Sequence, residues 1–273
     1  MCGFAAGLPL RFLLEDTIFL DEEELTDIKN PACTGPHLFS VLSYNIHQCV
    51  GLDGRRDPAR IAQIIKESGT DVIGLQEVHS ESGGSSESHQ IDYLTEATGF
   101  QAVAGPTLVR ENSRYGNVLL TSRKILSIHW VDLSFRSREP RGAIDVDLDI
   151  QGEAVRVIVT HLGLRPGERR FQVRRLLTAL AEERTRCVVL LSDINEWLPV
   201  CHPLRWLDAR LGRTKPLRTF PSFFPLLALD RIWVSPQPSL VSLAIYDTPL
   251  TRIASDHLPL KAVVRPSDTP LLQ

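Results

Sequence analysis

From Leu38 onwards, short apolar runs with the length of β-strands alternate along the chain with stretches that have the periodicity of an amphipathic helix. Helices are predicted from Pro58 to Ser68, around Ile91 to Thr98, and over residues 168–184, where apolar residues recur at i, i+3, i+4 and i+7. The strand-like runs are LFSVLSYN, DVIGLQE, GNVLLTS, AIDVDLDI, VRVIVTH, VVLLSD, DRIWV and PLKAVV. This alternation predicts an α/β sandwich.

The chain length of 273 residues allows a single α/β domain with a substantial core. A cluster of turn-forming residues, Asn30, Pro31, Gly35 and Pro36, separates the first segment from the first strand-like run. We therefore predict an N-terminal extension over residues 1–37, a catalytic domain over residues 38–265 and a C-terminal tail over residues 266–273.

Charge and cysteine content restrict the partners and the compartment. The formal net charge is −3, so the chain has no global positive field for a polyanion, and nucleic acid could bind only through a local basic patch. The five cysteines are scattered without a C-x-x-C pair, which argues against a disulfide framework or a zinc site. The N-terminus lacks the features of a signal peptide, and no apolar stretch reaches about 18 residues. We expect a cytoplasmic monomer without a transmembrane segment.

Several apolar runs stop on a residue that can bind a metal or move a proton, namely Asn45, Glu77, His161 and Asp193. Ligands of α/β proteins gather beyond the carboxyl ends of strands, so these four side chains are predicted to point into one site. Asp230, just before IWV, and the pair Asp256 and His257, just before PLKAVV, supply the rest.

The residue types in this set favour a hard divalent cation. Crowded carboxylates are tolerated where a cation neutralises them, and oxygen donors without a thiolate suit Mg²⁺, or Mn²⁺ in its place, rather than zinc. A histidine held by a carboxylate can accept a proton from water, since its reference pKa is about 6.5. Asp230 and His257 are predicted to form such a pair.

The segments SYNIH, LQEV, RYGNVLLTS, VTHLGL, LSDINEW, LDRIWV and SDHLPL follow one another along residues 38–265. In this order they resemble the motif series of the endonuclease/exonuclease/phosphatase superfamily, which has the DNase I-like fold. Within it, the chain is most similar to small bacterial members whose substrates these motifs do not define. The resemblance implies a four-layered α/β/β/α sandwich with two mixed sheets and a site at one edge.

The resemblance also implies roles in metal binding and water activation. Glu77 would be the principal metal ligand, with Asn45 and Asp256 near the ion and in contact with phosphate. Asp193 and Asn195 would position or activate the attacking water. Together these residues would neutralise the charge that makes a phosphate ester resist attack.

For the histidines, the resemblance implies contact with the reacting phosphate. His257, oriented by Asp230, would bind a phosphate oxygen or act as the base. His161 would stabilise the charge of the pentacoordinate transition state or assist the leaving group. The identity of the general base stays open between these residues and the aspartate that holds the water.

Four further residues are candidates for substrate binding. Arg141 begins a strand and is predicted to reach the substrate phosphate with its planar guanidinium. Arg165 follows His161 closely and is predicted to bind a second phosphate. Asn117 and Tyr115, in the sequence YGN, either face the site or belong to a turn, and both interpretations stay open.

The segment TFPSFFPLLALD places several large apolar residues immediately before Asp230. Packing in the core is the common explanation for such a segment. The alternative is an apolar lip beside the site, with Trp197 close by, because exposed apolar clusters often mark ligand or membrane surfaces. A lip of this kind would suit a lipid phosphate better than a nucleic acid backbone.

These features predict a Mg²⁺-dependent phosphohydrolase, acting as a phosphodiesterase, nuclease or phosphatase through in-line attack of water. Its substrate is either a nucleic acid or a phospholipid or small phosphate ester. The alternative is a catalytically silent module that binds a phosphate ligand or a metal on the same fold. The complete residue set favours the enzyme.

Overall fold

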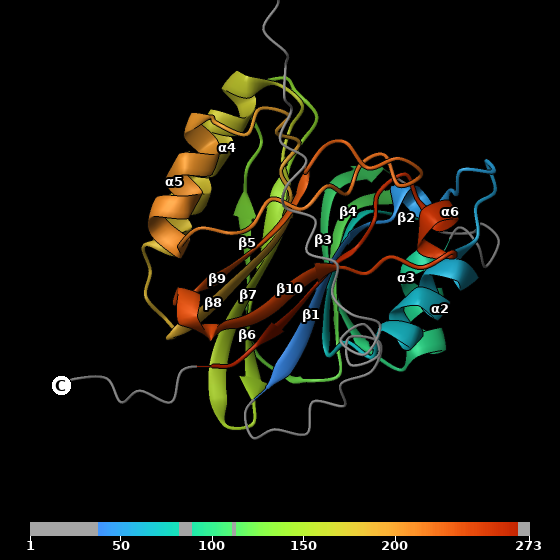
Figure 1. Cartoon of the computed structure of the whole chain (residues 1–273), viewed down its shortest axis with the longest axis horizontal. Helices are drawn as coiled ribbons and strands as arrows, with labels where there is room; N and C mark the ends of the chain where they lie inside the picture. Colours follow the sequence, from blue (N-terminus) through green and yellow to red (C-terminus); the bar gives the residue numbers. More distant parts are fainter. Residues whose placement is uncertain (1–37, 82–88, 111–112, 267–273) are drawn as a thin grey trace, which may run out of the picture. The chain divides into compact units, whose positions relative to one another are not determined.

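The structure is a computed structural model, and it describes residues 38–81, 89–110 and 113–266. The predicted N-terminal extension and all but the first residue of the predicted C-terminal tail lie outside the described residues. Two β-sheets and the helices that cover them make up the described part of the chain (Figure 1).

The first sheet has six strands in the order β10-β11-β1-β2-β4-β3. Their bounds are β1 Phe39–Asn45, β2 Val72–Glu81, β3 Gln101–Arg110, β4 Ser113–Thr121, β10 Leu240–Ile245 and β11 Leu260–Val264. Strand β1 runs parallel to β2 and antiparallel to β11, so this sheet is mixed.

The second sheet has five strands in the order β5-β6-β7-β8-β9. Their bounds are β5 Lys124–Asp132, β6 Gly142–Ile150, β7 Glu153–His161, β8 Cys187–Asp193 and β9 Asp230–Ser235. Strand β7 runs parallel to β8, while the other neighbours in this sheet are antiparallel. The second sheet is therefore mixed as well.

The helices cover the outer faces of the two sheets (Figure 1). Their bounds are α2 Pro58–Ser68, α3 Gln90–Thr98, α4 Pro166–Leu180, α5 His202–Leu211 and the short α6 Thr251–Ala254, with 3-10 turns η1 His47–Cys49 and η2 Gln237–Ser239. One buried apolar cluster joins residues of both sheets, a second packs α2 and α3 on the first sheet, and a third packs α4 and α5 on the second. The predicted four-layered α/β/β/α sandwich is confirmed.

Helix α4 begins and ends earlier than predicted, at Pro166–Leu180 instead of residues 168–184. Proline suits the first helical turn because that turn needs no backbone N–H donor. Near the other end, the buried Arg156 guanidinium donates to the carbonyl oxygens of Ala179 at 2.9 Å and Glu182 at 2.7 Å. A side chain from β7 thus satisfies carbonyl groups near the helix end, which periodicity alone does not reveal.

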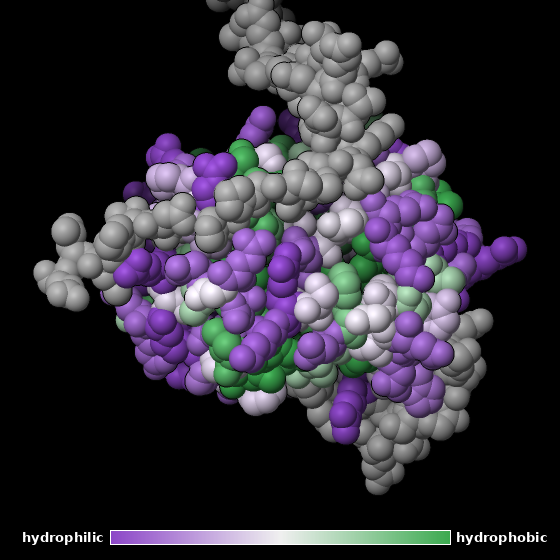
Figure 2. Space-filling view, turned by 90° about the horizontal axis from the view of Figure 1, so that it is seen from below, coloured by the Kyte–Doolittle hydropathy of each residue, from purple (hydrophilic) through white to green (hydrophobic). Residues whose placement is uncertain are grey.

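On the face seen in Figure 2, hydrophobic residues form small groups between hydrophilic ones. Among the described residues, none of the helices combines the length and the apolar character needed to cross a bilayer.

Candidate active site

The residues predicted at strand ends meet at one edge of the sandwich. Asn45, His161 and Asp193 end their strands, whereas Glu77 lies inside β2, which continues to Glu81. Because β1 and β2 are parallel, Asn45 pairs with the residue before Glu77, and because β7 and β8 are parallel, His161 pairs with Asp193. Asp193 also pairs with Asp230, the first residue of β9. The Asn45 Nδ2 atom donates to Glu77 Oε1 at 3.1 Å and to Asp193 Oδ2 at 2.9 Å. Asn45 therefore links the site residues of the two sheets.

Glu77 owes its position to a bulge in β2. The register with β4 shifts between Leu75 and Val78, and Glu77 has a φ of 58°, a left-handed conformation that is costly for a residue with a Cβ. Strain of this kind costs on the order of 1–3 kcal/mol and persists where the surrounding structure holds it. The bulge re-aims the half-buried Glu77 side chain towards Asn45.

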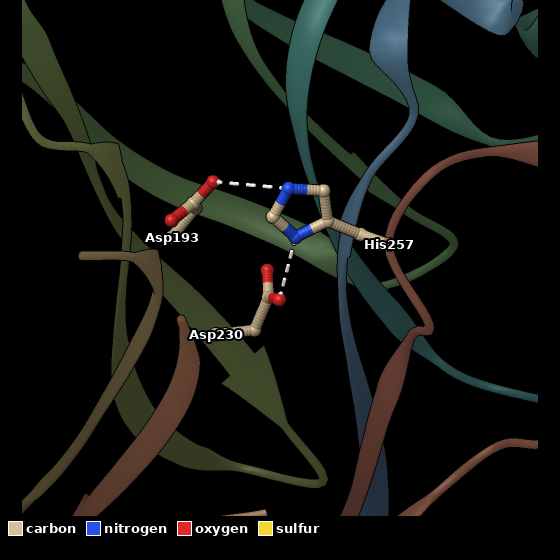
Figure 3. A group of neighbouring side chains, drawn as sticks. All are labelled: Asp193, Asp230 and His257. Atoms are coloured by element: carbon tan, nitrogen blue, oxygen red, sulfur yellow. Dashed lines mark hydrogen bonds and ion pairs between the residues drawn. The ribbon is translucent and has the colours of Figure 1, made fainter. Parts of the chain in front are cut away.

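His257 is held between two buried carboxylates, as Figure 3 shows. Its Nδ1 atom lies 2.8 Å from Asp230 Oδ2, and its Nε2 atom lies 3.8 Å from Asp193 Oδ2. Thr219 donates its hydroxyl to the same Asp230 oxygen at 2.5 Å. The predicted pair of Asp230 and His257 is present. One possible metal-ligand atom from each of Asp193, Asp230 and His257 lies within 4.8 Å of the other two.

The charges around His257 decide its protonation. Burial alone lowers the pKa of His257, but Asp230 and Asp193 outweigh it and raise the pKa to about 10. At neutral pH His257 therefore carries a proton on each ring nitrogen. Between the two predicted roles, this favours donation to a phosphate oxygen over proton abstraction from water.

Asp193 and Asn195 are joined through a tight turn after β8. The backbone N–H of Asn195 donates to Asp193 Oδ1 at 2.9 Å, and Asn195 has a φ of 49°, which asparagine tolerates better than most residues. Burial raises the pKa of Asp193, against the lowering effect of His161 and His257. A carboxylate with a raised pKa is a stronger proton acceptor, which suits the predicted activation of water.

His161 lies between two nitrogen donors. Its Nδ1 atom is 3.2 Å from Arg141 Nη1, and its Nε2 atom is 2.8 Å from Asn195 Nδ2. Burial lowers the pKa of His161 to about 3; Asp193 opposes this shift and Arg141 adds to it. An imidazolium would direct both of its N–H groups at donors, so the geometry also favours the uncharged ring.

The depressed pKa of His161 predicts a loss of stability at acidic pH. The contribution is fully present above pH 6.5 and is lost as pH falls through the folded pKa of about 3, because the unfolded chain takes up the proton first. In His161→Gln, the difference between the free energies of unfolding at pH 7 and pH 4 should shrink by about 3 kcal/mol at most. Urea unfolding at both pH values measures it. His129→Gln, a change at an exposed histidine, should leave the difference unchanged. Equal pH dependence in the wild type, His161→Gln and His129→Gln would refute the lowered pKa of His161.

The metal ligands implied by the resemblance are only partly in mutual contact. Glu77 and Asn45 touch, whereas Asp256 is connected to Asn45 through Ser255, whose hydroxyl donates to Asn45 O at 2.8 Å and to Asp256 Oδ1 at 3.3 Å. The Asp256 side chain is 31% exposed, and His47 Nδ1 lies 3.8 Å from it. The donors are carboxylate and amide oxygens, and Asp256 adds to the effect of Asp230 and Asp193 that raises the pKa of His257. This donor set fits a hard divalent cation.

The candidate substrate residues differ in where they lie. Arg141, Asn117 and Tyr115 line a small depression that also includes Glu77 and His161. Burial raises the pKa of Tyr115 and the neighbouring Arg141 lowers it, while the buried Asn117 donates to the carbonyl oxygen of Gly142 at 3.0 Å and so ties β4 to β6.

Arg165 stands apart from that depression. It precedes the first residue of α4 and is exposed, and no hydrogen bond or ion pair connects its side chain to the site residues within the described ranges.

Two functional neighbours were not singled out from the sequence. Thr219 holds Asp230, and Ser255 connects Asn45 with Asp256. Ser255 opens the segment SDHLPL and Thr219 opens the segment TFPSFFPLLALD, so their positions in these segments were the available signal.

Comparison with known proteins identifies the family. The model of the Endonuclease/Exonuclease/phosphatase family matches residues 42–257. The chain belongs to this family. Membership indicates a hydrolase that acts on phosphoester bonds. The protein YbhP of Escherichia coli (strain K12), itself described as uncharacterized, is 30% identical over 257 residues, a match that covers 86% of this chain and 99% of YbhP.

Solved structures of family members share the fold. The endonuclease/exonuclease/phosphatase from Beutenbergia cavernae DSM 12333 superposes with a TM-score of 0.70 at 22% identity, covering 86% of this chain and 73% of that chain. The human Nocturnin catalytic domain with bound sulfate anion superposes with a TM-score of 0.61 at 22% identity, covering 83% of this chain and 93% of that chain. At this identity the likeness establishes the architecture and leaves the substrate to be argued from the site.

Proposed function

We propose that the protein is a Mg²⁺-dependent phosphohydrolase that cleaves a phosphoester by in-line attack of water. The observation that supports this best is the single contact network at the sheet edge. Asn45 bonds both Glu77 and Asp193, and Asp193 lies against the pair of His257 and Asp230. This network supports the proposal, because the groups proposed to bind the metal, activate water and bind phosphate lie close to one another.

Each side chain has a task in this mechanism. Glu77, Asn45 and Asp256 would hold the cation, which when bound neutralises phosphate charge. Asp193, with its raised pKa, accepts the proton of the attacking water that Asn195 helps to orient.

The two histidines of the site complete the mechanism. Protonated His257 donates Nε2–H to a phosphate oxygen, while uncharged His161, held by Arg141, assists the leaving group.

Removal of the Glu77 carboxylate tests the metal site. In Glu77→Gln the Mg²⁺ concentration at half-maximal hydrolysis of bis-p-nitrophenyl phosphate should rise at least about tenfold, because a charged ligand becomes neutral. Glu67→Gln, an exposed change of the same kind on α2, should leave it unchanged. A wild type without turnover in either Mg²⁺ or Mn²⁺ would favour the catalytically silent binding module.

For the substrate, we favour an amphiphilic phosphoester such as a phospholipid over a nucleic acid. Phe223 and Phe224 are each 64% exposed at the tip of a loop closed by Phe220 and Leu227. The Phe220 ring lies 4.9 Å from the ring of His257, so the exposed pair sits on a loop that contacts the site. Packing accounts for Phe220, and the apolar lip accounts for the loop tip.

The double variant Phe223→Ser with Phe224→Ser tests the lip. Hydrolysis of phosphatidylcholine vesicles should fall at least about tenfold, since burying each phenyl ring contributes about 1.5–3 kcal/mol. Turnover of the soluble diester should stay unchanged. Val241→Ser on β10 serves as the control, because it removes a half-exposed apolar residue elsewhere. An equal loss on both substrates, or faster cleavage of plasmid DNA or RNA than of vesicles, would contradict the lipid preference.

The predicted cytoplasmic monomer remains a proposal. The cytoplasmic location, though not the oligomeric state, is supported by the free thiols of Cys49, Cys187 and Cys201 in the described part of the chain, which suit a reducing compartment.

A further inference from the structure

Arg231, in β9, is a buried cation that the described residues leave without a partner. Its side chain is 5% exposed, its Nε atom has no hydrogen-bond acceptor, and residues 38–81, 89–110 and 113–266 supply it with no ion pair within 4.0 Å. Burial lowers the pKa of Arg231, while Asp208 and Asp230 act in the opposite direction. Burying an unpaired charge costs free energy, so this environment favours an anion from outside the chain.

Arg231 lines a cavity of about 360 Å³ that is bounded by α5, β9 and the segment between them. Sites for small organic ligands have volumes of about 300–1,000 Å³, so the cavity is large enough for one. Arg205 and Arg213, both exposed, also line it. Asp208 is the one acid among the described lining residues, and its Oδ1 atom already accepts a hydrogen bond from Trp233 Nε1 at 2.8 Å. The cavity lining therefore has three guanidinium groups and one carboxylate, that of Asp208, which already accepts a hydrogen bond from Trp233.

The cavity is separate from the active site even though Arg231 follows Asp230 directly. Successive side chains of a strand point to opposite faces of the sheet. Ile232, like Asp230 two residues earlier, points to the face where the two sheets pack, and Trp233, like Arg231, points to the face covered by α4 and α5. A ligand in this cavity would lie behind the sheet that carries the catalytic residues.

The wall of the cavity is apolar beside the arginines. Val200 is 78% exposed, Leu204 is buried with 6% exposed, and Pro199 and Pro216 also line this side of the cavity. Exposed apolar residues next to a buried cation suit a ligand that combines an anionic group with an apolar or planar part.

We propose that this cavity binds a small organic phosphate, with the phosphate on Arg231 and the organic part against Val200 and Leu204. Guanidinium groups bind phosphate through two parallel N–H···O bonds, and the flanking Arg205 and Arg213 match the second charge of a phosphomonoester. The site is independent of the catalytic residues and does not require that the substrate be known.

Calorimetric titration of the full chain with adenosine 5′-monophosphate and with inorganic phosphate, both in EDTA, tests the proposal. Arg231→Met should weaken the binding of adenosine 5′-monophosphate at least about tenfold, because it removes the buried guanidinium but keeps an unbranched apolar side chain. Lys215→Met, which removes a neighbouring exposed charge outside the cavity lining, should change the affinity by less than about twofold. Inorganic phosphate should bind more weakly than the nucleotide.

Thermal unfolding in phosphate-free buffer distinguishes a ligand site from a structural arginine. The Tm of Arg231→Met should equal or exceed that of the wild type, since no bond within the described residues is lost. A lower Tm would show that the guanidinium stabilises the fold and would overturn the proposal. So would an unchanged nucleotide affinity in Arg231→Met, absent binding of both ligands to the wild type, or inorganic phosphate that binds as tightly as the nucleotide.

Discussion

Replacement of His257 by alanine is expected to lower the Mg²⁺-dependent rate of bis-p-nitrophenyl phosphate hydrolysis by about 10²–10³-fold, the usual cost of removing one preorganised donor to a developing charge. His257 carries a proton at neutral pH because Asp230 and Asp193 raise its pKa to about 10. Its 2.8 Å contact with Asp230 fixes the ring, and its Nε2–H faces Asp193 Oδ2 at 3.8 Å. Asp193→Asn should cause a loss of similar size, because an amide cannot accept the proton of water.

The control for this experiment is His129→Ala, which removes an exposed histidine from β5. It should retain full activity. Urea unfolding of each variant verifies that lost activity does not reflect lost structure. Ordinary turnover in both His257→Ala and Asp193→Asn, in folded protein, would remove the basis of the proposed mechanism.

The largest effect on stability is expected from Asp145→Ala, which should lower the free energy of unfolding by about 3–5 kcal/mol. Asp145 is 2% exposed and Arg156 is 1% exposed, and two hydrogen bonds of 2.9 and 2.6 Å join them. Arg184 also donates to Asp145 Oδ2 at 2.6 Å. Without Asp145, the Arg156 guanidinium would stay buried beside the end of α4 with no countercharge.

A surface ion pair provides the comparison. Arg252 and Asp247 lie 2.5 Å apart, but their side chains are 43% and 37% exposed, so Asp247→Ala should cost less than about 1 kcal/mol. Urea unfolding at pH 7 measures both losses. Equal losses of unfolding free energy in Asp145→Ala and Asp247→Ala would show that the burial of the Asp145–Arg156 pair does not add to its contribution to stability.

Most members of the site could be predicted because of a regularity of α/β folds. Apolar runs that form buried strands end at the edge of the sheet, and parallel neighbours end at the same edge. Asn45, His161 and Asp193 follow this rule, whereas Glu77 lies at a bulge inside β2. The order of these residues along the chain matches the family that the comparison then established.

Other features depended on contacts that periodicity does not encode. Helix α4 ends at Leu180, before the predicted end, and Arg156 on strand β7 binds carbonyl groups near that end. The composition of the segment around Phe223 does not indicate which of its residues are packed and which are exposed. That division follows from the position of the loop against the site.

The sequence by itself determined the fold class and identified polar residues that come together in space, because both follow from local patterns of apolar runs and the residues at or near their ends. Only the tertiary structure decided the charge states of His257 and His161 and the direction of the Glu77 side chain. It also decided that Arg231 is buried without an acceptor for its Nε atom among the described residues. These properties depend on burial and on partners distant in the chain. Asn45 and Asp193 meet across 148 positions, and no local pattern specifies which charges will lie beside them once the two sheets pack.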